Sequence, residues 1–243
     1  MKVSIICVYN NEQQLEQQLK ASLKKQNIKY EFIGINNIRN EYSSAAKALN
    51  YGASHATGDV LVFSHQDILL KTQNELNRFA CFISNASKGT IVGVAGALEK
   101  HKQNVGNYTS GIEINEVQIY KFNSPMEVSC VDECFFGMTR ATYEMHHFDE
   151  ILCDNWHLYA VEQCLYHRAN GGKVYVFPLQ VHHSSRGKIN LKYMDGLIKL
   201  ASCYRNNFRY IWTTCYKVRC NPIYCKTLRL IWITNRKIRR KEF

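Results

Sequence analysis

The sequence of 243 residues contains no uninterrupted apolar run of ~20 residues, the length that a helix needs to cross a membrane. Its first apolar run, "VSIICV", is too short for the core of a secretory signal, and no small-residue cleavage site follows it. We therefore expect neither a spanning helix nor export, and we expect the chain to stay in the cytoplasm.

Paired cysteine motifs are also missing, although the chain has 10 cysteines. Cys215, Cys220 and Cys225 are five residues apart, and Cys130 and Cys134 are four apart, so the C-x-x-C knuckle of structural zinc sites is absent. Disulfide frameworks are typical of small secreted chains, and this chain is large and lacks an export signal. We interpret the cysteines as reduced thiols that pack in the interior.

Charge is unevenly distributed along the chain. Residues 189–243 hold 13 Lys and Arg and 2 acids, whereas residues 1–188 hold 18 basic and 18 acidic residues. The whole net charge of +11 therefore belongs to the C-terminal tail. Such an asymmetry indicates an anionic partner for the tail, either a membrane surface or nucleic acid.

Apolar runs and helical patterns alternate in the first hundred residues. We expect strands at 3–8, 30–35, 59–64 and 90–96. Between them we expect a helix that starts at Asn10 or Asn11 and carries Leu15, Leu19 and Leu23 on one face, a helix at 43–56 that Gly58 ends, and a helix at 74–84. This β-α-β-α-β-α-β order predicts an α/β fold, a mostly parallel sheet flanked by helices.

Polar residues follow three of these strands. The first strand ends in "YNN", the second in "NNIRN" and the third in "FSHQD". Ligands bind beyond the carboxyl ends of strands in such sheets. His65 and Asp67 lie two apart in an extended segment, so their side chains share a face. We expect the three strand ends to converge on one crevice.

The second half of the chain changes character. Residues 100–130 mix polar, β-prone and turn residues and predict hairpins, and a helix at 156–169 is expected to end at Gly171-Gly172. "KVYVFPLQVHH" predicts a further strand at 173–183. Beyond Lys188, apolar and aromatic residues alternate with bases, and the sequence shows no internal repeat.

Four segments, taken in order, resemble one enzyme family. They are "VSIICVYNNEQQLEQQLKASLKKQ", "ALNYGASHATGDVLVFSHQD", "FFGMTRATYEMHHFDE" and "CDNWHLYAVEQCLYHRANGGKVYVFPLQVHH". They are similar to the nucleotide loop, the approach to the metal motif, the acceptor-side strand and the catalytic helix of family-2-type glycosyltransferases. The resemblance implies a GT-A (Rossmann-like) domain at 1–188 with a small β-hairpin region. Residues 189–243 would form a basic, aromatic-rich helical extension.

The metal motif of this family, Asp-x-Asp, reads His65-Gln66-Asp67 here, so the chain resembles a branch with a His-Gln-Asp variant. The resemblance implies a Mn²⁺ or Mg²⁺ ion held by Asp67 and His183, with His182 as a rival. His65 would supply a nitrogen ligand, contact the ribose or orient Asp67. A strand-end histidine that only makes hydrogen bonds is the alternative in each case.

The resemblance also implies a nucleotide site and a catalytic base. The nucleotide-binding residues would be Cys7, Val8, Tyr9, Asn10, Asn36, Asn50, Gly52 and His65. An ordinary turn at Asn36-Asn37 is the alternative for that pair. The base that takes the acceptor's proton would be Asp154, with Asp149 and Glu150 as competitors, unless these acids only cap helix ends.

We therefore expect a metal-dependent, inverting glycosyltransferase that uses a nucleotide sugar, a UDP-sugar, and a surface-polysaccharide or lipid-linked acceptor. The basic tail would dock on an anionic membrane at the cytoplasmic face of the inner membrane, or else pack on the enzyme body with solvated bases. No nucleic-acid-binding motif is present. The rivals are a non-catalytic scaffold that keeps the fold and a sugar-nucleotide nucleotidyltransferase. The latter needs a glycine-rich loop, which "CVYNNEQQ" lacks.

Overall fold

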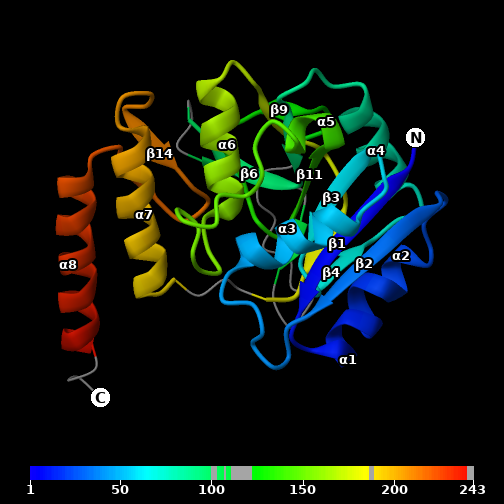
Figure 1. Ribbon diagram of the computed structural model, residues 1–243, viewed down its shortest axis with the longest axis horizontal. Coiled ribbons are helices and arrows are strands. Elements are labelled where there is room, and N and C mark those ends of the chain that lie inside the picture. Colours follow the sequence, from blue (N-terminus) through cyan, green and yellow to red (C-terminus); the bar gives the residue numbers. More distant parts are fainter. Residues whose placement is uncertain (100–102, 107, 111–121, 186–188, 240–243) are drawn as a thin grey trace.

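The structure is a computed structural model that describes residues 1–99, 103–106, 108–110, 122–185 and 189–239. Its centre is a sheet with the strand order β2-β1-β3-β11-β5-β12-β9 (Figure 1). Within it β1 is parallel to β2 and β3, and β5 is parallel to β12, whereas β11 and β9 run antiparallel to their neighbours. The expected mostly parallel sheet is thus confirmed. The strands are β1 Val3–Tyr9, β2 Tyr30–Asn36, β3 Val60–Ser64, β5 Ile91–Gly93, β9 Met126–Glu127, β11 Phe135–Thr139 and β12 Val174–Val176.

Helices cover both faces of this sheet. Side chains alternate between the two faces along each strand, and apolar side chains point to both faces, so each face has to be covered. From β1, Ile5 joins the apolar cluster of the first helical segment and α4, and Ile6 joins the cluster of α3, α6 and α7. Leu15, Leu19 and Leu23 all lie in the former cluster, as their spacing predicts. The helices are α1 Glu12–Leu15, the π-helical turn η1 Glu16–Lys20, α2 Ala21–Leu23, α3 Ala45–His55, α4 Glu75–Ser84, α5 Arg140–Tyr143, α6 Tyr159–Ala169, α7 Leu191–Tyr204 and α8 Pro222–Arg239.

The helix ends follow the sequence signals with one exception. The side chain of Asn11 accepts from the amide of Gln14 and caps α1, and Gly171 ends α6 at a φ of 79°. The expectation that Gly58 ends α3 is wrong, since α3 ends at the extended residue Ala56. Gly58 is needed for close packing instead. A Cβ there would lie 2.6 Å from Oγ and 2.7 Å from N of Ser4.

Two expected strands each divide between two sheets. The segment 90–96 gives β5 and then β6 (Ala95–Leu98), which pairs with β7 (Gln103–Gly106) and β10 (Cys130–Val131). The segment 173–183 gives β12 and then β13 (Val181–His183), with Pro178, which has no N–H to donate, between them. Strand β13 pairs with β4 (Ile68–Leu70) and β8 (Tyr108–Ser110). This division carries His183 to the turn after β3. Of the expected hairpin region, 100–102, 107 and 111–121 lie outside the described residues.

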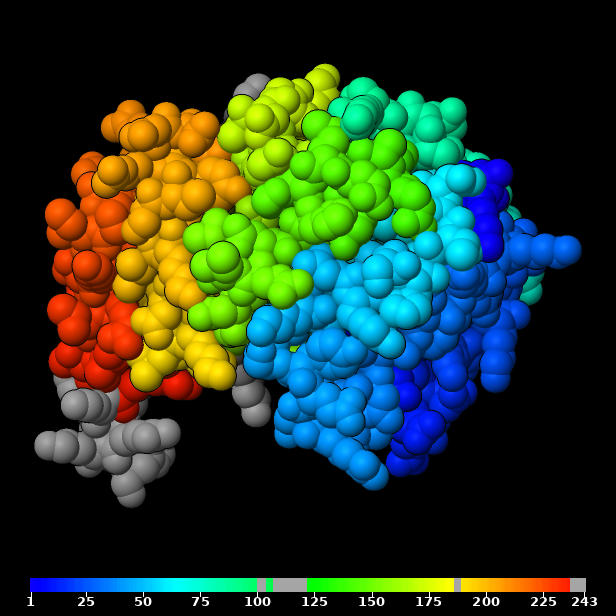
Figure 2. Space-filling model, viewed as in Figure 1, coloured from blue at the N-terminus to red at the C-terminus, as the bar shows by residue number. Residues whose placement is uncertain are grey.

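The tail is not wholly helical, because a hairpin of β14 (Tyr210–Trp212) and β15 (Lys217–Arg219) separates α7 from α8. Buried residues of α7 belong to the same apolar cluster as α3 and α6. Helix α8 lies along α7, to which Arg229 is tied by a 2.6 Å contact with Asp195, and the two helices form one flank of the molecule (Figure 2).

Among the helices of the described ranges, none has the length and apolar character that crossing a membrane requires.

Candidate functional site

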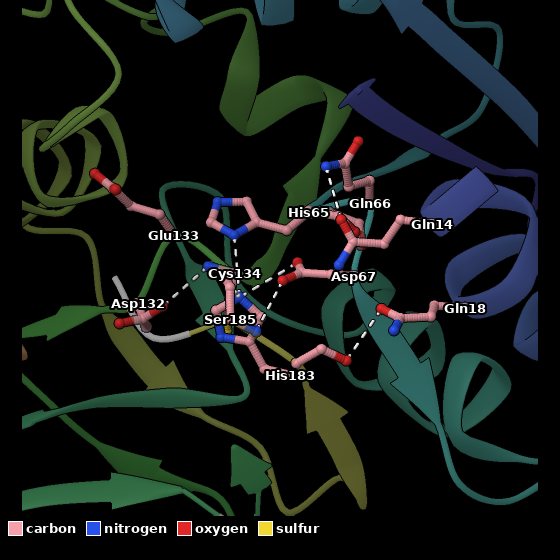
Figure 3. A network of polar contacts seen from close by, with 12 residues as sticks. Gln14, Gln18, His65, Gln66, Asp67, Asp132, Glu133, Cys134, His183 and Ser185 are labelled. Carbon is pink, nitrogen blue, oxygen red and sulfur yellow. Dashed lines mark hydrogen bonds and ion pairs between the residues drawn. The ribbon is translucent and has the colours of Figure 1, made fainter. Parts of the chain in front are cut away.

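Two histidines and one aspartate meet where β3 and β13 end. The Nε2 atom of His183 lies 3.4 Å from Oδ1 of Asp67 and 3.3 Å from Nδ1 of His65. The backbone N–H of Ser185 donates to the other oxygen of Asp67 at 3.0 Å (Figure 3). One ligand atom from each of the three side chains lies within 4.8 Å of the others. The register of β13 against β4, with His183 opposite Ile68, sets this meeting.

The pKa values of the two histidines in the cluster shift in opposite directions. Burial alone would raise the pKa of Asp67, but the hydrogen bonds from His183 and Ser185 outweigh it and hold that pKa well below its usual range. Burial would lower the pKa of His183, yet the Asp67 carboxylate raises it. Burial, together with His183, lowers the pKa of His65 to about 4, so His65 is neutral at physiological pH.

The second ring nitrogen of His65 has its own partner. Nε2 lies 3.2 Å from the hydroxyl of Tyr159, which begins α6 and donates to the carbonyl of Glu133 at 3.5 Å. If the hydroxyl donates to this carbonyl, it accepts from the ring, and Nε2 then carries the proton while Nδ1 presents its lone pair to the cluster. Two imidazole nitrogens and one carboxylate are a donor set that suits a divalent transition metal.

A cavity of about 430 Å³ opens beside these side chains. The ends of β1, β2, β3 and β13 and the loop before α6 surround it, as expected for converging strand ends. Its lining residues are Val8, Tyr9, Asn10, Gln14, Asn37, Asn40, His65, Gln66, Asp67, Trp156 and Ser185. A smaller, mainly apolar cavity of about 90 Å³ shares Val8, His65 and Trp156 with it.

The structure brings some of the expected nucleotide-binding residues to this cavity. Val8, Tyr9, Asn10 and His65 line it. Cys7 is buried in the core, and its thiol contacts the carbonyl of Val8.

Three other expected residues have structural partners. Asn36 accepts from the amide of Ile38, which is the ordinary turn. Asn50 bonds the carbonyl of Phe148 and the side chains of Tyr143 and Glu150. A Cβ at Gly52 would lie 2.6 Å from Cγ2 of Ile6, so this glycine lets α3 approach β1.

The three expected acids do not line either cavity. Asp154 contacts Nζ of Lys199 at 2.6 Å, and Oε1 of Glu150 accepts from Asn50 at 2.9 Å. Oδ1 of Asp149 accepts from the amides of Ile151 and Leu152, both at 2.8 Å, which is a turn cap.

A further acid, Asp132, acts on the same two histidines. Its charge partly offsets the lowering of the pKa of His65 by burial and adds to the raising of the pKa of His183, and its oxygens accept from the amide of Cys134 at 3.0 Å and the hydroxyl of Thr214 at 2.8 Å.

Several residues that line the cavity could not be identified from the sequence. The sequence presents Gln66 only as the middle residue of His-Gln-Asp and Trp156 only as the expected start of a helix. Trp156 in fact precedes α6, keeps 37% of its surface exposed and borders both cavities. Exposure of an aromatic ring is a tertiary property that no local pattern carries. Among the described residues, the histidine that joins the cluster is His183 and not His182.

The sheet order and the polar cavity at its carboxyl edge define an α/β protein of the GT-A type. The chain belongs to the glycosyltransferase-like family, whose sequence model matches residues 4–194. No curated protein sequence is significantly similar to the chain.

Solved structures share the fold at low sequence identity. GalNAc-T7 with UDP, GalNAc and Mn²⁺ has a TM-score of 0.59 at 14% identity, over 82% of this chain and 48% of its own. TarS 1–349 from S. aureus with UDP-GlcNAc has a TM-score of 0.57 at 14% identity, over 85% of this chain and 67% of its own. The mannosyltransferase PcManGT from Pyrobaculum calidifontis with GDP-Man and Mn²⁺ has a TM-score of 0.54 at 14% identity, over 82% of this chain and 60% of its own. This chain thus spans about half the length of GalNAc-T7.

Proposed function

We propose that the protein is an inverting, metal-dependent glycosyltransferase that moves a sugar from a UDP-sugar to a surface-polysaccharide or lipid-linked acceptor. The observation that carries the proposal is the His65–Asp67–His183 cluster at the edge of a 430 Å³ cavity. Neighbours of the same fold hold UDP, UDP-GlcNAc or GDP-Man, which supports a nucleotide sugar as the donor.

Asp67, His183 and His65 are the residues that would hold a divalent cation. Two neighbours contain Mn²⁺, and the two ring nitrogens beside one carboxylate suit Mn²⁺ better than Mg²⁺. A bound cation supplies positive charge to the diphosphate as it leaves. The backbone of Val8 to Asn10 and the side chains of Asn37 and Asn40 would bind the nucleoside, since they line the same cavity.

The transfer also needs a base for the acceptor's proton. Asp154 contacts Lys199, and Asp132 accepts from Cys134 and Thr214, and neither acid lines the cavity. We therefore keep both Asp154 and Asp132 as candidates for the acid that takes the acceptor's proton. The substitutions Asp132→Asn and Asp154→Asn separate the two, because only the base variant loses turnover while it keeps donor binding.

The tail would bring the enzyme to its acceptor. One side of α8 packs on α7, while Ile223, Leu230 and Ile231 remain 72%, 61% and 51% exposed. Lys226 is exposed on the same helix, and the tail carries the whole excess of positive charge. An apolar face among bases is the pattern of a helix that lies on an anionic membrane. A lipid-linked acceptor would be met there.

The first test is thermal unfolding with a panel of nucleotide sugars, each with Mn²⁺ and then with EDTA. A ligand that binds only the folded protein raises the melting temperature by mass action. We expect a UDP-sugar to raise it in Mn²⁺ only. Asp67→Asn should abolish this shift, and Asp195→Asn, which changes an acid of α7 away from the cavity, should keep it.

The other outcomes separate the rivals. A shift that is equal with EDTA would remove Asp67 as a metal ligand. The absence of a shift with every donor would favour the scaffold. A shift with a nucleoside triphosphate in place of nucleotide sugars would favour the nucleotidyltransferase.

A further inference from the structure

Gln66 makes four hydrogen bonds with the start of the first helical segment. Its Oε1 accepts from the backbone amides of Asn10 at 2.9 Å and Asn11 at 3.0 Å. Its Nε2 donates to Oδ1 of Asn10 at 2.9 Å and Oε1 of Gln14 at 3.1 Å. A carboxamide has two acceptor and two donor positions, so the capacity of this side chain is fully used. Because backbone amides only donate, they also fix which end of the carboxamide is oxygen.

These bonds join two separate parts of the cavity wall. Gln66 lies between His65 and Asp67, on the turn that carries two residues of the metal cluster (Figure 3). Its partners belong to the loop after β1 and to α1 itself: Asn11 caps α1, and Asn10 in the loop and Gln14 in the helix line the cavity. The amide of an N-cap residue has no partner within its helix, so an outside acceptor has to satisfy it. For Asn11, and for Asn10 just before it, this acceptor comes from the turn after β3.

We propose that Gln66 is a positioning residue that holds the β1–α1 loop ready for the nucleoside diphosphate, at a fixed place relative to the metal-binding side chains. The inference rests on the proposed function. With the loop already held, the ligand does not have to order it on binding, and affinity is gained by that preorganisation. Loss of the four Gln66 hydrogen bonds therefore weakens nucleotide binding. It leaves binding of the metal alone unchanged, since Gln66 offers no ligand to the cluster.

The experiment compares Gln66→Met with Gln26→Met in the full-length protein. Methionine has a similar length and makes none of these bonds. Gln26 is a matched control, because its buried amide donates to the carbonyl of Thr72 at 2.7 Å and accepts from the amide of Leu76 at 2.9 Å without lining either cavity. Titration calorimetry measures the Kd of UDP and of GDP in Mn²⁺, and electron paramagnetic resonance measures the Kd of Mn²⁺ alone.

We expect Gln66→Met to raise the Kd of UDP about tenfold and to leave the Kd of Mn²⁺ within about twofold of the wild type. Gln26→Met should lower the melting temperature and leave both constants unchanged. Hydrogen exchange at the amides of Asn10 and Asn11 should accelerate only in Gln66→Met.

Three results would overturn the proposal. The first is an unchanged UDP affinity in Gln66→Met, and the second is an equal loss of affinity in Gln26→Met. The third is unaltered hydrogen exchange at Asn10 and Asn11, because the loop would then hold its place without Gln66. If the wild-type protein binds neither UDP nor GDP, the proposed function fails and this inference fails with it. Binding by the wild type with equal binding by Gln66→Met would remove only the inference.

Discussion

At the position of His65, an imidazole stands where the metal motif that this chain resembles has a carboxylate. A carboxylate can turn either oxygen to a cation, but an imidazole must present one particular nitrogen without its proton. The hydroxyl of Tyr159 lies 3.2 Å from Nε2, and by accepting a hydrogen bond it would keep the proton there. As a metal ligand, His65 would therefore depend on the tyrosine at the start of α6.

The substitution Tyr159→Phe tests this role. The hydroxyl is lost and the ring of His65 can change its tautomer, so we expect affinity for Mn²⁺ to fall about tenfold, the lower end for partners that orient a metal ligand. Calorimetric titration with Mn²⁺ measures it. Tyr143→Phe is the matched control, since its hydroxyl donates to Asn50 at 2.9 Å and lines neither cavity. Equal Mn²⁺ affinity in both variants would show that Tyr159 does not orient His65.

At the scale of elements, the amino ends of β1, β2 and β3 are tied by Glu31. Its carboxylate accepts from the hydroxyl of Ser4 at 2.5 Å and from the amide and hydroxyl of Thr57, each at 2.8 Å. Ser4 in turn accepts from the amide of Gly58 at 2.8 Å. This cluster holds the α3–β3 connection onto β1, at the edge of the sheet opposite the cavity.

The hydrogen bonds from Ser4 and Thr57 lower the pKa of Glu31 to about 2. A carboxyl whose pKa is lower in the folded state stabilises the fold at neutral pH, and this contribution is lost as pH falls from about 4.5 towards 2. We expect Glu31→Gln to be less stable than the wild type at pH 7 and the difference to narrow over that range. Urea unfolding at pH 7, 5 and 3 measures it, with Glu41→Gln, an exposed acid after β2, as the control. A difference that does not change with pH would rule out the ionised carboxylate as its source.

The helices and strands also differ in how far the sequence could predict them. Local sequence patterns predicted α3 and α4, each of which buries apolar residues on one side, and β1, a continuous apolar run that is buried on both faces of the sheet. Sheet membership is a long-range property, so neither the antiparallel insertion of β11 between β3 and β5 nor the division of 173–183 between two sheets was foreseen. Asp67 and His183 were expected together by resemblance, and they do meet. The partners of Asp154 and Asn50 depended on side-chain packing, which no sequence pattern encodes.

At the scale of the whole molecule, charge and exposed apolar surface coincide. The body of residues 1–188 is neutral and contains the cavity, whereas the tail carries the net charge of +11 and an outer helix with an exposed apolar face. Helix α8 stands at the outer flank, with α7 between it and the rest of the fold (Figure 1). Docking through α8 would therefore leave the carboxyl edge of the sheet free to receive the donor.

Vesicle binding tests this arrangement. The combined variant Ile223→Ser, Leu230→Ser and Ile231→Ser should lose most binding to vesicles that contain anionic lipid, because the apolar area that enters the headgroup region is gone. Wild-type binding should weaken as salt is raised, since bases attract anionic lipid over about a Debye length. Co-sedimentation measures both. Ile151→Ser is the control, because Ile151 is 83% exposed but lies in the loop after α5. Equal sedimentation of the triple variant and the control would place the membrane contact elsewhere. If the wild type bound neutral and anionic vesicles equally, the positive charge of the tail would not contribute to binding.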